Sequence, residues 1–217
     1  MNAPMTRKFI AVEGPIGVGK TSLAKRLADS FGSELLLEGP DDNPFLERFY
    51  KSPRQAALPT QLFFLFQRAQ QLQELRQNDM FQPVRVSDFL LEKDRLFAQV
   101  TLDHDEFRLY EEVYRHMTVE APAPDLVIYL QAPIDVLLER IRQRGNHYER
   151  AIEAGYLEQI AQAYMRFFHY YDAAPLLIIN TATIDLVNHD GDYNFLLEQI
   201  RGLRGGRHYF NPLPISL

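Results

Sequence analysis

Residues 8–22 read KFIAVEGPIGVGKTS, and the fold is decided by this stretch. The opening KFIAVE is a short, mostly apolar run that ends at a glycine, which predicts a buried strand. Residues 14–21 match the pattern G-x-x-x-x-G-K-[ST], and residues 21–31 then carry apolar side chains at helical spacing. A strand, a glycine-rich turn and a helix in this order predict a phosphate-binding loop, or P-loop. The alternative, a glycine-rich turn with a solvated lysine, leaves the flanking strand and helix unexplained.

The predicted loop is suited to holding the phosphates of a nucleotide. Its glycines let backbone N–H groups converge on phosphate oxygens, and the N-terminus of the following helix adds partial positive charge. In such loops the lysine reaches the β- and γ-phosphates and the hydroxyl residue after it ligates Mg²⁺. We therefore assign ATP binding to the loop residues Gly14, Pro15, Ile16, Gly17, Val18, Gly19, Lys20, Thr21 and Ser22.

Short apolar runs alternate with helical segments along the rest of the chain. Strands that are apolar on both faces and separated by helices indicate a parallel sheet that is covered on both sides. The fold class we predict is α/β: a three-layer fold with a five-stranded parallel sheet flanked by helices, in one domain over residues 1–217 with an irregular tail from about residue 205. The strands are expected at residues 8–13, 34–37, 84–87, 125–130 and 176–180, and the helices at 21–31, 59–78, 89–100, 104–118, 134–144, 156–171 and 193–203.

Composition excludes several classes of protein. The chain has 23 Lys and Arg against 29 Asp and Glu, a formal charge of −6, and 46% hydrophobic residues, which is ordinary for a globular protein and excludes collagen-like and disordered chains. It has no cysteine, so disulfides, thiolate metal sites and cysteine nucleophiles are excluded. The mild acidity argues against a general nucleic-acid or membrane-surface binder. The start MNAPMTRKF lacks the apolar core of a signal peptide, and we expect a cytoplasmic protein.

A P-loop alone is compatible with motors, switches and transport ATPases, but one domain of 217 residues suits a P-loop kinase of small molecules. Glu38 follows the second predicted strand directly. Ligands collect at the carboxyl ends of parallel strands, so Glu38 and the P-loop should face one crevice. A carboxylate there can accept the proton of an attacking hydroxyl. An exposed loop acid is the equally open alternative.

The helix expected from residue 59 carries two polar residues on its apolar stripe. Gln61, Phe64, Leu65, Arg68 and Leu72 share one face at helical spacing. Buried polar groups need partners, and a glutamine can make paired hydrogen bonds to the edge of a nucleobase. The alternative, in which Gln61 and Arg68 bridge neighbouring elements, has equal weight on this evidence.

Four arginines gather where the helix 134–144 ends at a Gly-Asn turn: Arg140, Arg142, Arg144 and Arg150. Arg140 and Arg144 are four residues apart and share a helix face, while Arg142 points away. An Arg-rich lid over approximately residues 140–150 could close over a triphosphate and stabilise charge on the moving phosphoryl group. The alternative is a solvated basic face. Beside a P-loop we favour the lid, and we assign Arg140, Arg142 and Arg144 to ATP binding.

These segments together resemble the deoxynucleoside kinase family. The similarity lies in GPIGVGKTS, the Glu after the second strand, the spacing of Tyr50, Gln61 and Arg68, and the lid RIRQRGNHYE. The segments DNPFLERFY, QLFFLFQR and SDFLLEKDRLFA are similar to those of the bacterial deoxyguanosine/deoxyadenosine kinase branch. The resemblance extends over about residues 9–171.

The resemblance implies a role for each matching residue. Glu38 matches the general base that takes the proton of the 5′-hydroxyl. The other matches are Gln61, which hydrogen-bonds the base; Arg68, beside the 5′-hydroxyl and base edge; Tyr50 and Glu149, which hold the 3′-hydroxyl; Phe97, which stacks on the base; and Arg140 and Arg144, the lid arginines over the phosphates.

Three positions depart from the family's pattern. The frequent Glu/Asp-Arg-Ser motif after the third strand is SDF at residues 87–89, so Asp88 keeps a carboxylate that can organise Mg²⁺ but the arginine is absent. The common last arginine of the lid is Asn146. The aspartate that pairs with the base-side arginine falls at Lys93 on a gap-free count, with Asp94 one residue further.

The sequence therefore predicts an ATP-dependent kinase of deoxyribonucleosides that works in nucleotide salvage. Its expected substrate is a purine, deoxyguanosine or deoxyadenosine, with deoxycytidine also open. The expected catalytic residues are Glu38, Lys20, Arg68, Arg140 and Arg144. Thr21 and Asp88 are expected to bind Mg²⁺, partly through water, and Asp88 is also assigned to the substrate-binding site. Surplus apolar residues on the long helix, Phe63 and Phe66, suggest a homodimer interface, as the family implies.

Two other functions remain open at this point. One is a thymidylate-type nucleoside monophosphate kinase, which would need a cationic site for an acceptor phosphate where this sequence has Glu38. The other is a non-catalytic P-loop protein that binds nucleotides as a regulator.

Overall fold

The computed structural model describes residues 9–77, 85–117 and 122–211. Within these residues the strands and helices alternate along the chain, as the sequence predicts. The strands are β1 (Phe9–Glu13), β2 (Glu34–Leu36), β3 (Arg85–Ser87), β4 (Leu126–Gln131), β5 (Leu176–Asn180) and β6 (Arg207–Phe210). The helices are α1 (Lys20–Phe31), α2 (Leu46–Lys51), α3 (Pro53–Gln77), α4 (Glu92–Thr101), α5 (His104–Met117), α6 (Ile134–Arg144), α7 (Ala154–Tyr170) and α8 (Asp190–Gly202), with short 3₁₀ turns η1 (Pro40–Asp42) and η2 (Tyr148–Ala151).

One sheet holds the described strands in the order β2-β3-β1-β4-β5-β6, and every neighbouring pair is parallel. The predicted parallel sheet is confirmed, but the expected count of five strands is wrong because β6 adds a sixth. β6 lies in the segment predicted as an irregular tail from about residue 205, of which residues 212–217 are outside the described part. The four-residue strand was missed because its burial, with only Phe210 fully covered, is too short a pattern to recognise.

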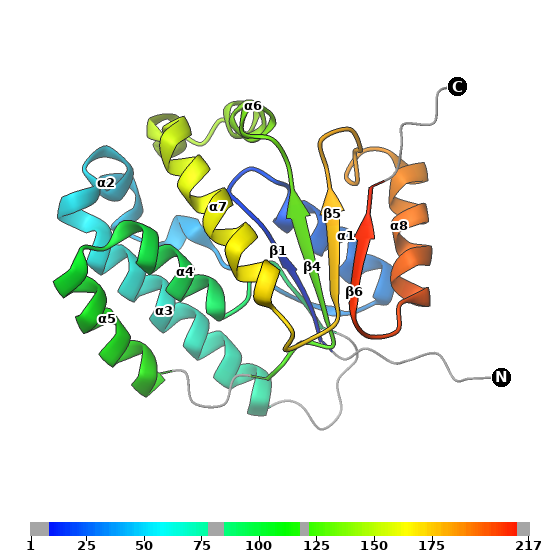
Figure 1. Ribbon diagram of the computed structural model, residues 1–217, viewed down its shortest axis with the longest axis horizontal. Coiled ribbons are helices and arrows are strands. Elements are labelled where there is room, and N and C mark those ends of the chain that lie inside the picture. The colour runs from blue at the N-terminus through cyan, green and yellow to red at the C-terminus, as the bar shows by residue number, and fades with distance from the viewer. Residues whose placement is uncertain (1–8, 78–84, 118–121, 212–217) are drawn as a thin grey trace.

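The sheet is the middle of three layers (Figure 1). Successive side chains of a strand point to opposite faces. Ile10 and Val12 of β1 therefore pack into the core beneath α1 and α8, and Ala11 packs into the core beneath α4 and α7. β2 departs from the expected two-sided burial: it is an edge strand, and Leu35 is 37% exposed.

The helices follow their predicted positions with four corrections, of which the first is that α8 begins at Asp190 rather than residue 193. α3 begins at Pro53 rather than residue 59, and Pro59 lies inside it, where its missing N–H removes one backbone hydrogen bond. α4 begins at Glu92 rather than residue 89, because Phe89 and the two residues after it belong to the buried connection from β3. α2 was not predicted. The expected element ends at residues 8, 78, 84 and 118 lie outside the described residues.

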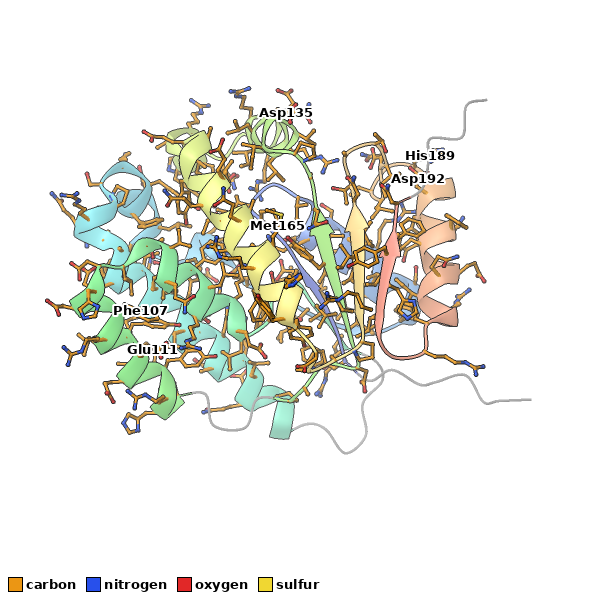
Figure 2. The ribbon with its side chains drawn as sticks, viewed as in Figure 1. Phe107, Glu111, Asp135, Met165, His189 and Asp192 are labelled. Carbon is orange, nitrogen blue, oxygen red and sulfur yellow. The ribbon has the colours of Figure 1, made fainter. Side chains whose placement is uncertain are left out.

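Polar contacts at helix surfaces support this arrangement. The His189 ring Nδ1 accepts a hydrogen bond of 3.3 Å from the Asp192 backbone N–H and caps the start of α8 (Figure 2). Glu111 of α5 accepts a 2.7 Å hydrogen bond from the Arg95 Nε of α4 and joins the two helices. Over the described part of the chain, the helices are too short or too polar to cross a bilayer.

Substitution of Phe210 tests the sixth strand. The Phe210 side chain is 6% exposed in the core beneath α8, so Phe210→Ala should lower the free energy of unfolding by about 3 kcal/mol. Tyr209 is 71% exposed on the same strand, and Tyr209→Ala should change it by no more than about 0.5 kcal/mol. Denaturant unfolding measures both. Equal effects of the two variants would mean that this segment is not a strand with one buried face.

Candidate active site

The P-loop turns from β1 into α1 at the carboxyl end of the sheet, next to α6. Gly14 and Gly17 have φ angles of 147° and 84°, which disfavour residues with a side chain. A Cβ atom on Gly14 would collide with the Leu130 carbonyl of β4, and one on Gly17 would lie 2.8 Å from the Leu137 carbonyl of α6. The loop is therefore packed directly against the strand and helix that lead into the predicted lid. In Figure 1, α6 lies beyond the tips of the β4 and β5 arrows.

Lys20, the first residue of α1, is half-buried beside this loop. Its Nζ donates hydrogen bonds to the carbonyls of Gly14 at 2.8 Å and Pro15 at 3.1 Å. Two main effects lower the pKa of Lys20 from 10.5 to about 7: burial, which is the larger, and the nearby positive charge of Lys93. A lysine whose charged form is destabilised in this way favours an anionic partner, because a nearby phosphate would stabilise the charged form.

Glu13, the last residue of β1, anchors the P-loop to neighbouring elements. Its buried carboxylate accepts hydrogen bonds from the backbone N–H of Gly14 at 2.9 Å and of Leu90 at 2.7 Å, and from the Tyr164 hydroxyl at 2.7 Å. These contacts join the P-loop to the segment after β3 and to α7. The position of the P-loop is therefore fixed relative to the segment after β3, which carries Asp88, and relative to α7.

The two predicted Mg²⁺ ligands lie together. The Thr21 hydroxyl donates a 2.5 Å hydrogen bond to Oδ2 of Asp88, and the Glu38 backbone N–H donates to Oδ1 at 2.9 Å. Mg²⁺ at phosphotransfer sites uses one or two protein oxygens and takes further ligands from phosphates and water. The Thr21 and Asp88 oxygens fit that ligand set.

Two cavities meet at the P-loop. The larger, of about 600 Å³, is lined by residues 17–23 of the loop and α1, by Arg140, and by residues 181–188 after β5. The smaller, of about 100 Å³, is lined by every residue predicted to bind the nucleoside. These residues are Glu38, Tyr50, Gln61, Arg68, Asp88, Phe97 and Glu149. We call the first the donor cavity and the second the acceptor cavity.

The residues common to both cavities mark the passage between them. They are Gly17, Lys20, Thr21 and Arg144. A phosphoryl group that moved from one cavity to the other would pass the ammonium of Lys20 and the guanidinium of Arg144. The residues predicted to bind ATP and those predicted to bind the nucleoside thus lie on either side of Lys20 and Arg144.

Four alternating charges form a chain, which we call the ion chain: Asp94, Arg68, Glu38 and Lys93. The last three line the acceptor cavity, and Asp94 lies behind Arg68. Nη1 of Arg68 lies 2.5 Å from Oδ1 of Asp94, and Nη2 of Arg68 contacts Oε1 of Glu38. Nζ of Lys93 donates to Oε2 of Glu38 at 2.6 Å. Burial raises the pKa of the Asp94 carboxyl, and it lowers the pKa of Lys93 from 10.5 to about 8.

The ion chain shows which residue pairs with Arg68. The gap-free count that placed this partner at Lys93 is one residue out, because Asp94 makes the contact to Arg68. The stripe on α3 is confirmed as an inner face: Gln61 and Arg68 are 2% and 3% exposed. Arg68 bridges neighbouring elements, as the second interpretation has it, and it also lines the cavity, so its contact with a nucleoside stays a prediction.

Aromatic rings and an ion pair border the acceptor cavity. Tyr50 stacks on Tyr148 with ring centroids 6.2 Å apart, and the Tyr148 hydroxyl donates to Oδ1 of Asp41. Arg144 donates to both carboxylate oxygens of Glu149, at 2.9 and 2.7 Å. The turn at Gly145 and η2 is thus held against α2 and η1.

The lid arginines have different surroundings. Arg140 donates to the Thr181 carbonyl at 2.7 Å and hydroxyl at 2.9 Å, and so lines the donor cavity as part of its wall. Arg142 is exposed, 3.8 Å from Glu139, and lies outside both cavities. The geometry therefore does not support the assignment of Arg142 to ATP binding. Its side chain points away from the Arg140 and Arg144 face, as helical spacing predicts.

Sequence reasoning missed several residues of the site. Glu13 was assigned only to a strand. A carboxylate at the end of an otherwise apolar, buried strand is unusual, and this could have indicated a residue with a specific role. The loop at residues 181–188 carries no motif and was not assigned, yet it forms a wall of the donor cavity. The buried Thr60 hydroxyl lines the acceptor cavity and has no hydrogen-bond partner among the described residues.

A P-loop between a donor cavity and an acceptor cavity with a buried carboxylate defines a phosphotransferase of the P-loop kinase class. Within that class, the family model described as deoxynucleoside kinase matches residues 10–203. The chain belongs to the deoxynucleoside kinase family, and it is a kinase.

Relatives and solved structures agree with this family. A deoxyguanosine kinase from Bacillus subtilis is 34% identical over 206 residues, which cover 91% of this chain and 98% of the relative. A deoxyadenosine kinase from Lactobacillus acidophilus is 29% identical and covers 89% of this chain and 94% of the relative. The structure of deoxyadenosine kinase from M. mycoides with the products dCMP and dCDP superposes with a TM-score of 0.78 at 24% identity, over 90% of this chain and all of that one. That likeness shows the fold.

Proposed function

We propose that the protein transfers the γ-phosphoryl group of ATP to the 5′-hydroxyl of a purine deoxyribonucleoside, with Mg²⁺. The observation that carries this proposal is the Glu38 carboxylate, held by two cations in the acceptor cavity, which Lys20 also lines. The relatives named deoxyguanosine kinase and deoxyadenosine kinase support a purine substrate. Deoxycytidine is a weaker candidate, supported by a Bacillus subtilis deoxyadenosine/deoxycytidine kinase at 29% identity.

The transfer follows from the residues at the passage. Glu38 accepts the proton of the 5′-hydroxyl, the oxygen lone pair forms the bond to the γ-phosphorus, and the β–γ bridging oxygen leaves with its electron pair on ADP. Lys20 and Arg144 stabilise the negative charge on the transferring group. Mg²⁺, held by Thr21 and Asp88, would neutralise charge on the β- and γ-phosphates.

The acceptor cavity also offers groups for the sugar and base. In this proposal Tyr50 and Glu149 hold the 3′-hydroxyl, Gln61 pairs with the base edge and Phe97 stacks on its plane. A ligand pocket for a whole nucleoside is ordinarily 300 Å³ or more. In this proposal the Tyr148–Asp41 contact and the Arg144–Glu149 pair part as the nucleoside enters, and Arg144 becomes free for the phosphates.

A thymidylate-type nucleoside monophosphate kinase fits this cavity less well. An acceptor phosphate needs cations that are available to it. Arg68 and Lys93 are the buried cations beside the acceptor position, and both already neutralise carboxylates, Asp94 and Glu38.

We also propose that the protein is a cytoplasmic homodimer. Phe66 is 49% exposed on α3 and Phe63 beside it is half-buried, so this helix face carries apolar surface beyond what its own core needs. Sedimentation at micromolar concentration should give twice the chain mass of 25.2 kDa. A mass equal to one chain would contradict the dimer and leave the catalytic proposal intact.

The reaction itself is tested with a mixture of deoxynucleosides and ATP labelled in the γ-phosphate. Labelled 5′-monophosphates of deoxyguanosine or deoxyadenosine are expected, in greater yield than those of the pyrimidines. UMP and dTMP are offered in a parallel reaction. Transfer to these monophosphates alone would favour the rival kinase, and no transfer to any acceptor would exclude the proposal.

Replacement of the proposed base is the second test. Glu38→Gln keeps the size of the side chain but cannot take a proton, so kcat should fall by about 10²–10⁴-fold. ATP binding, measured by calorimetry, should be retained because the donor cavity does not contain Glu38. The matched control is Glu74→Gln on the exposed face of α3, which should behave as wild type. Wild-type turnover in Glu38→Gln would remove the assigned role.

A further inference from the structure

Lys93 is a buried cation in the acceptor cavity to which the mechanism above assigns no step. Its side chain is 5% exposed, and its Nζ lies 2.6 Å from Oε2 of Glu38 and 5.5 Å from the centroid of the Phe97 ring. Burial of a lysine is costly unless its charge has a partner. Lys93 has such a partner in the Glu38 carboxylate, and the nearby carboxylates of Glu13, Asp88 and Asp94 also favour its charged form.

The charges of the ion chain divide into two pairs. Arg68 lies 2.5 Å from Asp94, whose side chain is fully buried, so Asp94 neutralises Arg68. Lys93 then gives Glu38 a second cation beside Arg68, with its Nζ 2.6 Å from Oε2 of Glu38. The two contacts also reach different oxygens of Glu38, Oε1 from Arg68 and Oε2 from Lys93. Together they fix both the position and the rotation of the carboxylate.

The connection between β3 and α4, residues 88–91, contains no lysine or arginine that could neutralise Glu38. The residue after Asp88 is Phe89, which is fully buried and packs in the core with Leu65 and Tyr110 of α3 and α5. Lys93 reaches the cavity from the first turn of α4 instead, where Phe97 on the following turn lies beside it. The charge is thus supplied by the start of a helix whose inner face already lines the site.

We propose that Lys93 is the positioning residue of the proposed base: it holds the Glu38 carboxylate in the rotation that meets the 5′-hydroxyl. This inference rests on the proposed function. When Glu38 takes the proton from the 5′-hydroxyl, Lys93 loses its partner. Its positive charge then acts on the negative charge that develops at the passage, where Lys20 already stands.

The first test is Lys93→Met, which keeps a side chain of similar length and removes the charge. Misplacement of a reacting group costs on the order of 10²-fold in rate, so kcat should fall by about that factor while KM for ATP stays unchanged. The matched control is Lys51→Met, which removes an exposed lysine 2.7 Å from Glu47 and should keep wild-type kinetics. An unchanged kcat in Lys93→Met would overturn the inference.

A double-mutant cycle with Glu38→Gln separates positioning from a general structural role. If Lys93 acts through Glu38, adding Lys93→Met to Glu38→Gln should reduce the residual single-turnover rate little or not at all. The same fold loss in both backgrounds would overturn the inference.

Lys93→Arg covers the case in which Lys93→Met unfolds. Lys93→Arg keeps the positive charge, so it should retain more turnover than Lys93→Met. If Lys93→Met does not fold, Lys93→Arg is compared with Glu38→Gln instead and should retain more turnover than that variant. Turnover no better than that of the variant it is compared with would contradict a role for the charge. Wild-type protein without transfer would overturn the proposed function and this inference together, whereas active wild-type protein with active Lys93→Met would overturn the inference alone.

Discussion

The charge of Glu38 is the constraint on which the site depends, because an ionised carboxylate that is largely removed from water is stable only with cations fixed around it. Arg68 from α3 and Lys93 from α4 supply them, and Asp94 balances Arg68 in turn. The ion chain thus explains why polar residues lie on the inner face of α3. It also explains why α3 and α4 must pack together at this end of the sheet.

The P-loop is fixed to the same structure from the other side. Glu13 joins the loop to the segment after β3, and Asp88 in that segment binds both the Thr21 hydroxyl and the Glu38 backbone. The donor and acceptor cavities therefore keep a set distance at the passage. Such fixed geometry supplies much of the rate in phosphoryl transfer, because the protein's task is to position groups and to stabilise charge.

Motifs with a local physical cause could be predicted from the sequence, and contacts between distant segments could not. The P-loop, the parallel sheet and the inner position of Gln61 followed from residue spacing, and the structure confirms them. β6 could not be predicted, since its burial depends on α8 and β5. Nor could the exchange of partners between Lys93 and Asp94, because a one-residue step on a helix turns a side chain by about 100° and a linear count does not show which residue faces Arg68.

The most direct measurement of the central claim is a crystal structure with deoxyguanosine and ADP bound. The account predicts the 5′-oxygen within about 3.2 Å of a Glu38 carboxylate oxygen, on the side of the cavity that faces Lys20. It also predicts that Lys93 and Arg68 still hold Glu38 in that complex. A 5′-oxygen directed away from Glu38, or a nucleoside bound outside the acceptor cavity, would contradict it.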